Sequence, residues 1–237
     1  MRYQFVDCRW ELMDPDAGRC AYLAGHVPGA SFLDVDADLS DLSVPDAGRH
    51  PLPSAERFAA AAGRAGIGDG VFVVAYGSGG GPERLWWLLR HFGHDDCAVL
   101  LGGCEDWGGE LRAGEEEIAP LEFVPREREG DTIQADEIVR RLGDASLALV
   151  DARAASRWRG EPNPIDDPPG RIPGAANAPW MEPFPEELPP GELVVYCGSG
   201  VSSCVTLHRA WLTGREGRLY PGSWSEWSKR GLPVERG

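Results

Sequence analysis

Two halves of this chain carry the same four motifs in the same order, and this internal repeat restricts the folds that the chain can form. Each half has a strand-like run with Asp, a Gly-x-x-Pro-Gly-Ala turn, an apolar run before a glycine-rich loop, and a glycine-containing turn that leads to Trp. In the first half these lie at residues 6–10, 25–30, 71–76 and 101–107. In the second half they lie at residues 149–153, 170–175, 193–197 and 220–227. Gly77 and Trp107 are 30 positions apart, as are Cys197 and Trp227, so Gly77 and Cys197 occupy equivalent places.

The apolar runs alternate with helical patterns, which is typical of parallel-sheet α/β units. Helices are expected at residues 54–65, 82–92, 134–142 and 202–213. Each half is therefore predicted to be a small parallel sheet with helices on both faces. Residues 114–131 are rich in Glu, Pro and Arg and lack periodicity, as expected near a linker. The predicted division is residues 1–118, a linker over 119–131, and residues 132–237.

Composition narrows the possible partners. The 237 residues are 42% apolar, enough to bury a core, and the formal net charge of −15 would repel nucleic acids and anionic membranes. The N-terminus lacks a signal-peptide pattern and no apolar stretch reaches a membrane span, so we expect a cytoplasmic protein with no membrane partner. The six cysteines form no Cys-x-x-Cys pair and no zinc-ligand spacing, so neither a metal site nor a cofactor is expected.

The strongest chemical signal is the loop that begins at Cys197. It follows an apolar run and precedes a helical pattern, which places Cys197 at the carboxyl edge of a sheet, where open α/β folds bind ligands. Gly198 and Gly200 allow successive N–H groups to point inward beside a helix N-terminus, which forms an anion-binding nest. A thiol with a pKa of about 8.5 is only about 3% ionised at neutral pH, and these contacts favour the thiolate. Cys197 is thus predicted to be a nucleophile, whereas Cys204, further along the helix, is expected to face the core.

These motifs resemble those of the tandem rhodanese family, especially its 3-mercaptopyruvate sulfurtransferases, over nearly the whole chain. The resemblance is carried by CGSGVSSC at 197–204, DARAASRWRG at 151–160, the two Pro-Gly-Ala turns and GSWSEW at 222–227. It implies two rhodanese-like domains, of which the first is inactive because Gly77 replaces the nucleophile. It also implies that Cys197 carries a persulfide formed from a small sulfur donor and passes the sulfur to a thiol, such as thioredoxin or a small thiol, or to cyanide.

The resemblance also implies roles for other residues. Ser199, Asp36 and His50 are expected to move protons with Cys197. Asp36 and His50 lie in an extra segment, roughly residues 36–53, which the second half lacks. The remaining candidates are expected to bind the donor: Arg157, Gly198, Gly200, Val201, Ser202 and Arg171.

The chain departs from the family pattern where mercaptopyruvate enzymes often carry a second donor-binding arginine. Ile165 occupies that place, and Arg171 or Arg159 is considered as its substitute. Since Gly198 and Ser199 replace the basic loop residues of thiosulfate-preferring relatives, 3-mercaptopyruvate is the favoured donor. The alternatives are a thiosulfate:cyanide sulfurtransferase and a non-catalytic persulfide carrier. A Cys-based phosphatase would need Arg six positions after the nucleophile, where this chain has Ser203.

Overall fold

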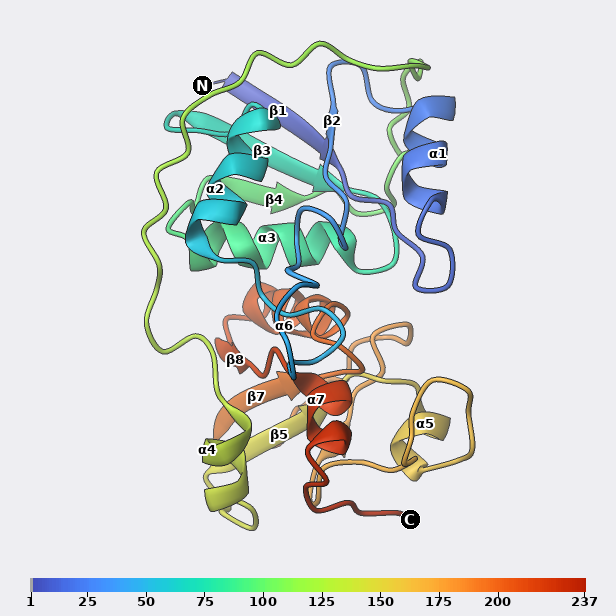
Figure 1. Cartoon of the computed structure of the whole chain (residues 1–237), viewed down its shortest axis with the longest axis vertical. Helices are drawn as coiled ribbons and strands as arrows, with labels where there is room; N and C mark the ends of the chain where they lie inside the picture. The colour runs from blue at the N-terminus through green and yellow to red at the C-terminus, as the bar shows by residue number, and fades with distance from the viewer. Residues whose placement is uncertain (1) are drawn as a thin grey trace. The chain divides into compact units, whose positions relative to one another are not determined.

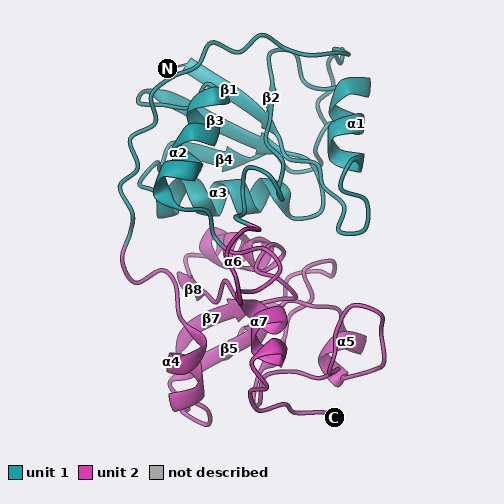
Figure 2. Ribbon diagram, in the orientation of Figure 1, with its two compact units in different colours: residues 1–41, 52–128 teal, residues 42–51, 129–237 magenta. Residues whose placement is uncertain are grey.

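The computed structural model describes residues 2–237 and divides the chain into two compact units. Unit 1 comprises residues 1–41 and 52–128, and unit 2 comprises residues 42–51 and 129–237 (Figure 2). The segment Leu42–Pro51 therefore belongs to unit 2, although both of its flanks belong to unit 1. Within the described residues, no helix is both long and apolar enough to cross a membrane.

Unit 1 contains one parallel sheet of four strands in the order β2-β1-β3-β4 (Figure 1). Its strands are β1 (Arg2–Asp7), β2 (Ser31–Phe32), β3 (Val71–Tyr76) and β4 (Cys97–Val99). Its helices are α1 (Ala17–Ala24), α2 (Ala55–Arg64) and α3 (Gly81–His91). Ser54 caps α2, because its side chain accepts a hydrogen bond from the N–H of Arg57 at 3.2 Å.

Unit 2 repeats this topology in a second parallel sheet, with the order β6-β5-β7-β8. Its strands are β5 (Leu147–Asp151), β6 (Ala176–Asn177), β7 (Glu192–Tyr196) and β8 (Gly217–Leu219). Its helices are α4 (Ala135–Arg140), α5 (Ala155–Arg159), α6 (Ser203–Leu212) and α7 (Ser223–Lys229). The expected class of two parallel sheets with helices is confirmed.

The two units have the same topology, and each contains an equivalent set of polar contacts. Arg9 forms an ion pair with Asp7 at 2.5 Å, and Arg153 forms one with Asp151 at 2.6 Å. Each arginine also donates through Nη2 to the carbonyl of the glycine that opens the Pro-Gly-Ala turn, at 2.7 Å in both units. The sequence repeat is therefore a repeat of polar contacts that join the end of a strand to its following turn.

The four predicted helices correspond to α2, α3, α4 and α6, and each ends within a few residues of its expected bounds. Helices α1, α5 and α7 lie outside the predictions. Two of them, α5 and α7, have five and seven residues, and helices this short give a weak periodic signal. Helix α7 matters for function, because it begins beside the loop that follows β7.

Candidate active site

Cys197 is the first residue after β7, and α6 begins six positions later. Its side chain is buried, and its backbone N–H donates to Oγ of Ser223 at 3.1 Å. Because β7 is an inner strand of the parallel sheet, the thiol lies at the carboxyl edge of the sheet, as predicted from the sequence.

The loop between β7 and α6 places N–H groups around the Cys197 sulfur. The N–H of Gly200 donates to Sγ at 3.1 Å. Gly200 has a φ of +87°, and a methyl group there would lie 2.5 Å from the carbonyl oxygen of Pro221, so only glycine fits. Val201 in the same loop is buried, and its carbonyl accepts from the N–H of Cys204 at 3.0 Å. Ser202 occupies the N-cap position of α6.

This surrounding favours the ionised form of the thiol. Burial alone would raise the pKa of Cys197, since it removes water from the thiolate. The Ser202 hydroxyl and the backbone N–H groups of Ser199 and Ser203 outweigh burial, so that the pKa of Cys197 lies below the ordinary value. Cys97 in unit 1 contrasts with it, because burial raises the pKa of that thiol to about 12.

The start of α7 holds the nucleophile loop in place. The N–H of Trp224 donates to the carbonyl of Cys197, and the N–H of Ser225 donates to that of Gly198, each at 3.0 Å. Ser223 adopts a φ of +52°, which is uncommon for a residue other than glycine, while its hydroxyl donates to Tyr220 and accepts from the N–H of Cys197. Neither Ser223 nor Ser225 was expected from the sequence to have a role. The Gly-Ser-Trp-Ser motif was their only signal.

Arg157 approaches the loop from α5. Its Nη2 would lie 3.0 Å from a methyl group placed on Gly198. The same guanidinium pairs with Asp166 through two hydrogen bonds of 2.6 Å, and Asp166 also accepts from Arg153 at 3.1 Å. Burial would raise the pKa of Asp166, but the hydrogen bond from Arg157 and the charges of the arginines lower it. Asp166 is therefore a shared counter-ion that orients Arg157.

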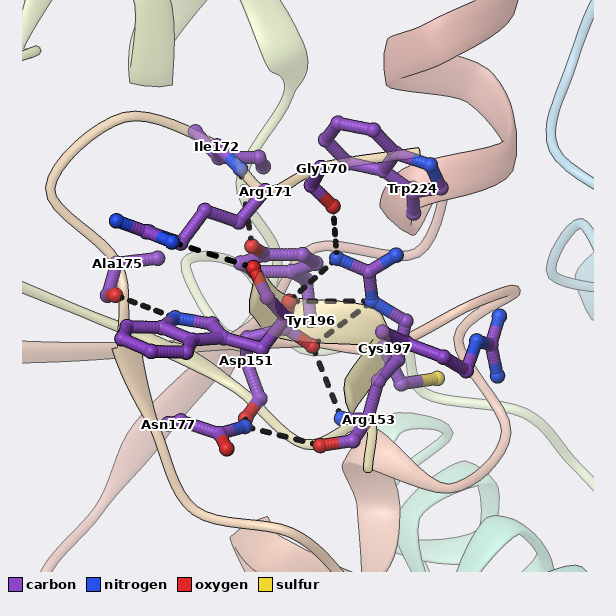
Figure 3. Close-up of polar contacts among 12 residues, drawn as sticks. Asp151, Arg153, Gly170, Arg171, Ile172, Ala175, Asn177, Tyr196, Cys197 and Trp224 are labelled. Carbon is purple, nitrogen blue, oxygen red and sulfur yellow. Dashed lines mark hydrogen bonds and ion pairs between the residues drawn. The ribbon is translucent and has the colours of Figure 1, made fainter. Parts of the chain in front are cut away.

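Neither arginine considered as a substitute for Ile165 reaches this loop. Arg171 forms an ion pair with Glu235 and lies over the ring of Trp158, with its guanidinium carbon 4.0 Å from the ring centre. Figure 3 shows its guanidinium extending away from the sulfur of Cys197. Arg159 is half-exposed and pairs with Glu161. The expectation that Arg171 binds the donor is thus not supported by its position.

The first unit explains why Arg171 has this partner. His26 occupies the equivalent place in the first Pro-Gly-Ala turn, and Glu116 lies 3.4 Å from its Nε2. Glu116 accepts from the N–H of Gly29 at 2.8 Å, as Glu235 does from the N–H of Gly174. Unit 1, which has no nucleophile, contains the same arrangement. We therefore interpret the ion pair of Arg171 and Glu235 as a structural contact that stabilises the turn.

The segment Leu42–Pro51 carries His50 and an arginine that the sequence analysis did not single out. Arg49 donates its backbone N–H to Oγ of Ser225 at 2.9 Å. Its Nη2 would lie 2.8 Å from a methyl group on Gly198. His50 is buried in the same segment. Arg49 is adjacent to His50 in a segment unique to the first half, and that adjacency is the signal that could have identified it.

Asp36 lies in unit 1. Its Oδ2 accepts from Nε1 of Trp10 at 3.4 Å, and its backbone N–H donates to Asp34 at 2.8 Å. Residues 2–237 contain no cluster of three or more His, Cys, Asp or Glu side chains suited to a metal ion.

The equivalent loop of unit 1 has no room for a nucleophile. Gly77 has a φ of +140°, and a methyl group on it would lie 2.6 Å from the backbone nitrogen of Arg9. A methyl group on Gly81 would lie 2.0 Å from the carbonyl oxygen of Cys8. Unit 1 therefore keeps the sheet and the loop but excludes a side chain at the place of Cys197.

Comparison with known proteins places these features in context. A family model described as a rhodanese-like domain matches residues 1–110 and 134–230. A probable 3-mercaptopyruvate sulfurtransferase of Pseudomonas aeruginosa is 39% identical over 249 residues, which cover 94% of this chain and 88% of the relative. A putative thiosulfate sulfurtransferase, SseB, of Mycobacterium tuberculosis is 35% identical, with 98% of this chain and 90% of the relative covered.

Solved structures agree with the sequence relatives. SseA from Escherichia coli, described among 3-mercaptopyruvate sulfotransferases with a rhodanese fold, has a TM-score of 0.79 and 31% identity, over 94% of this chain and 93% of that chain. The 3-mercaptopyruvate sulfurtransferase from Leishmania major has a TM-score of 0.81 and 31% identity, over 96% of this chain and 70% of that chain.

Proposed function

The chain belongs to the family of tandem rhodanese-like sulfurtransferases, and we propose that it moves one sulfur atom from 3-mercaptopyruvate through a persulfide on Cys197 to a thiol acceptor. The observation that supports this proposal is the environment of Cys197 at the edge of a sheet, where the N–H of Gly200 donates to Sγ and the hydroxyl of Ser202 lowers the thiol pKa. A persulfide is also an anion, so the same contacts stabilise the intermediate.

The proposed reaction has two steps. The Cys197 thiolate attacks the donor sulfur, a sulfur–sulfur bond forms, and the bond between sulfur and carbon of the donor breaks. The carbon leaves as the enolate of pyruvate, and the proton of the donor thiol ends on its methyl carbon. In the second step, the thiolate of an acceptor takes the outer sulfur and Cys197 is regenerated.

We assign the proton transfers to Ser199, His50 and Asp36, and the binding of the donor carboxylate to Arg157. Ser199 lies in the nucleophile loop, His50 belongs to the same unit as Cys197, and Arg157 approaches Gly198. The role of Asp36 rests on the family resemblance. The N–H groups of Gly198, Gly200, Val201 and Ser202 form the cradle for the transferred sulfur. Thioredoxin or a small thiol in the cytoplasm, where thiols are kept reduced, is the proposed acceptor.

Thiosulfate is the second candidate donor, and a specific contact favours it. The loop itself is neutral at Gly198 and Ser199, but the guanidinium of Arg49 lies beside Gly198 and supplies a cation for a sulfonate. Thiosulfate would leave sulfite after the same attack.

Mass spectrometry with paired rate measurements tests the proposal. Incubation with donor should add one sulfur, about 32 Da, to the intact protein. Cys197→Ser should abolish both the adduct and turnover, while Cys204→Ser should keep most activity, because Cys204 is buried on α6. With cyanide as common acceptor, we expect a higher kcat/KM for 3-mercaptopyruvate than for thiosulfate.

Each alternative has its own outcome in this experiment. A tenfold preference for thiosulfate would reject the choice of donor but keep the mechanism. An adduct without turnover of either donor would identify a persulfide carrier. Full activity of Cys197→Ser would reject the mechanism itself.

A further inference from the structure

Two guanidinium groups converge on the backbone next to the nucleophile. Nη2 of Arg49 and Nη2 of Arg157 would lie 2.8 Å and 3.0 Å from a methyl group on Gly198. They come from separate parts of the chain, since Arg157 is on α5 and Arg49 is in the segment Leu42–Pro51 of unit 2. Because Gly198 has no side chain, both guanidinium groups can lie this close to the backbone beside Cys197.

The backbone of Arg49 is held independently of its side chain. Its N–H donates to Ser225, whose own N–H donates to the carbonyl of Gly198. The preceding Gly48 packs so closely on α7 that a methyl group there would lie 2.5 Å from the carbonyl oxygen of Gly222. These contacts fix the position of the Arg49 backbone. They do not involve the Arg49 side chain, so we expect them to remain when that side chain is substituted.

The two arginines differ in how their charges are balanced. Arg157 is paired with Asp166, which also serves Arg153. Arg49 has no ion pair among the described residues, and its Nε is buried without a hydrogen-bond partner. Burial and the charge of Arg157 lower the pKa of Arg49, while Asp166 and Cys197 oppose that shift. The three arginines therefore carry one more charge than Asp151 and Asp166 together, before the Cys197 thiolate is counted.

We propose that Arg49 is a second anion-binding residue of this site, and that with Arg157 it grips the anionic group of the sulfur donor above Gly198. The arrangement replaces the donor-binding arginine that the family resemblance led us to expect where Ile165 stands. The identity of the donor rests on the proposed function, but the anion selectivity at Cys197 does not. The half-buried guanidinium of Arg49, which has no ion pair among the described residues, gains a charge-assisted partner when a carboxylate or sulfonate binds, and this provides the driving force.

Alkylation of Cys197 tests this proposal without any sulfur donor. The thiolate displaces iodide from either iodoacetate or iodoacetamide and forms the same kind of carbon–sulfur bond. Only iodoacetate carries a charge, so the ratio of the two rate constants measures attraction of an anion. Changes in the pKa or exposure of the thiol affect both reagents and cancel in the ratio.

We expect Arg49→Gln to lower this ratio about 10-fold or more, because a contact between a charged pair is lost while the length of the side chain is kept. Arg49→Lys, which preserves the charge, should retain a ratio closer to that of the wild type. The matched control is Arg159→Gln, which removes an arginine of the same unit that pairs with Glu161, and it should leave the ratio unchanged. Alkylation is followed by intact mass with Cys197→Ser as the blank.

Equal rate changes for both reagents in Arg49→Gln, or no change in either, would overturn the proposal. A loss in Arg49→Lys as large as that in Arg49→Gln would overturn it as well, since charge would not be the cause. With donor, Arg49→Gln should raise KM more than it lowers kcat. If the alkylation ratio falls but no donor is turned over, the proposed function fails and the anion site stands.

Discussion

At the scale of single residues, the ionisation of Cys197 depends on neighbours that contribute in different ways. Ser202 lowers the thiol pKa through its hydroxyl, whereas Ser199 lowers it through its backbone N–H. Truncating the Ser202 side chain therefore removes its contribution to the thiol pKa, whereas truncating the Ser199 side chain leaves the contribution of Ser199 in place. This difference separates the electrostatic role of the loop from the proton-transfer role proposed for the Ser199 hydroxyl.

We expect Ser202→Ala to raise the pKa of Cys197 and Ser199→Ala to leave it nearly unchanged. The thiolate is present above its pKa, so loss of a stabilising hydrogen bond moves the midpoint of alkylation to higher pH. One hydrogen bond to a charged group corresponds to about 1–2 pH units. The pH profile of the iodoacetamide rate measures the midpoint. A shift of equal size in Ser199→Ala would contradict the assignment of its contribution to the backbone.

Ser199→Ala should nevertheless slow turnover of 3-mercaptopyruvate, since the proposed mechanism uses its hydroxyl to move a proton. Because the pKa of Cys197 is expected to be unchanged in Ser199→Ala, slower turnover in this variant would be due to the proton transfer and not to ionisation of the thiol.

At the scale of elements, the site depends on how closely the segment Leu42–Pro51 packs on the start of α7. Gly48 has no space for a side chain, and the ion pair of Asp46 with Lys229 on α7, at 3.3 Å, is exposed. An exposed pair of this kind contributes little stability, so the close backbone contact and the hydrogen bond to Ser225 position the segment.

We expect Gly48→Ala to lower kcat/KM strongly while costing about 1–3 kcal/mol of stability, because the methyl group meets backbone atoms that cannot rotate away. Donor kinetics and the free energy of unfolding from denaturant titration measure the two effects. Gly29→Ala is a suitable comparison: it introduces the same methyl group at a positive φ of +78° with no atom within 4 Å. Unimpaired kinetics in Gly48→Ala would show that the segment need not pack this closely.

At the scale of the whole molecule, the local charge at the site is opposite to that of the chain. The formal net charge is −15, yet arginines outnumber carboxylates in the group beside Cys197. Binding of an anionic donor therefore depends on these few side chains. One of them, Arg49, belongs to the segment Leu42–Pro51, which is separated from the rest of unit 2 by about a third of the sequence.

This separation predicts that residues 129–237 alone bind anionic donors poorly, because the fragment lacks Arg49 and His50. We expect a decrease in kcat/KM of at least about 10-fold for either donor, from the loss of one charge-assisted contact. Circular dichroism and denaturant titration establish whether the fragment is folded before its rates are compared with those of the full chain. Undiminished rates in a folded fragment would remove any role for Leu42–Pro51.

The repeat, the sheet class and the position of Cys197 at a strand end were predictable from the sequence, because each is encoded within a short stretch. Short continuous apolar runs mark the strands, and glycines mark the loop between β7 and α6. The helical patterns at residues 54–65, 82–92 and 202–213 were long enough to show a period. Donor binding by Arg171 was inferred from its position in the motif, and the structure gives that guanidinium another partner, Glu235.

Only the tertiary structure decided where the guanidinium groups point. An arginine side chain is long and flexible, so its direction depends on which carboxylate or backbone lies near it after folding. Asp166 orients Arg157, and contacts with α7 bring Arg49 from a distant segment to Gly198. The lack of space for a side chain at Gly77 also depends on a distant segment, since the backbone of Arg9 fills the space that a nucleophile would need. Local sequence patterns therefore determined the fold and the nucleophile, and contacts between distant segments determined the charges around it.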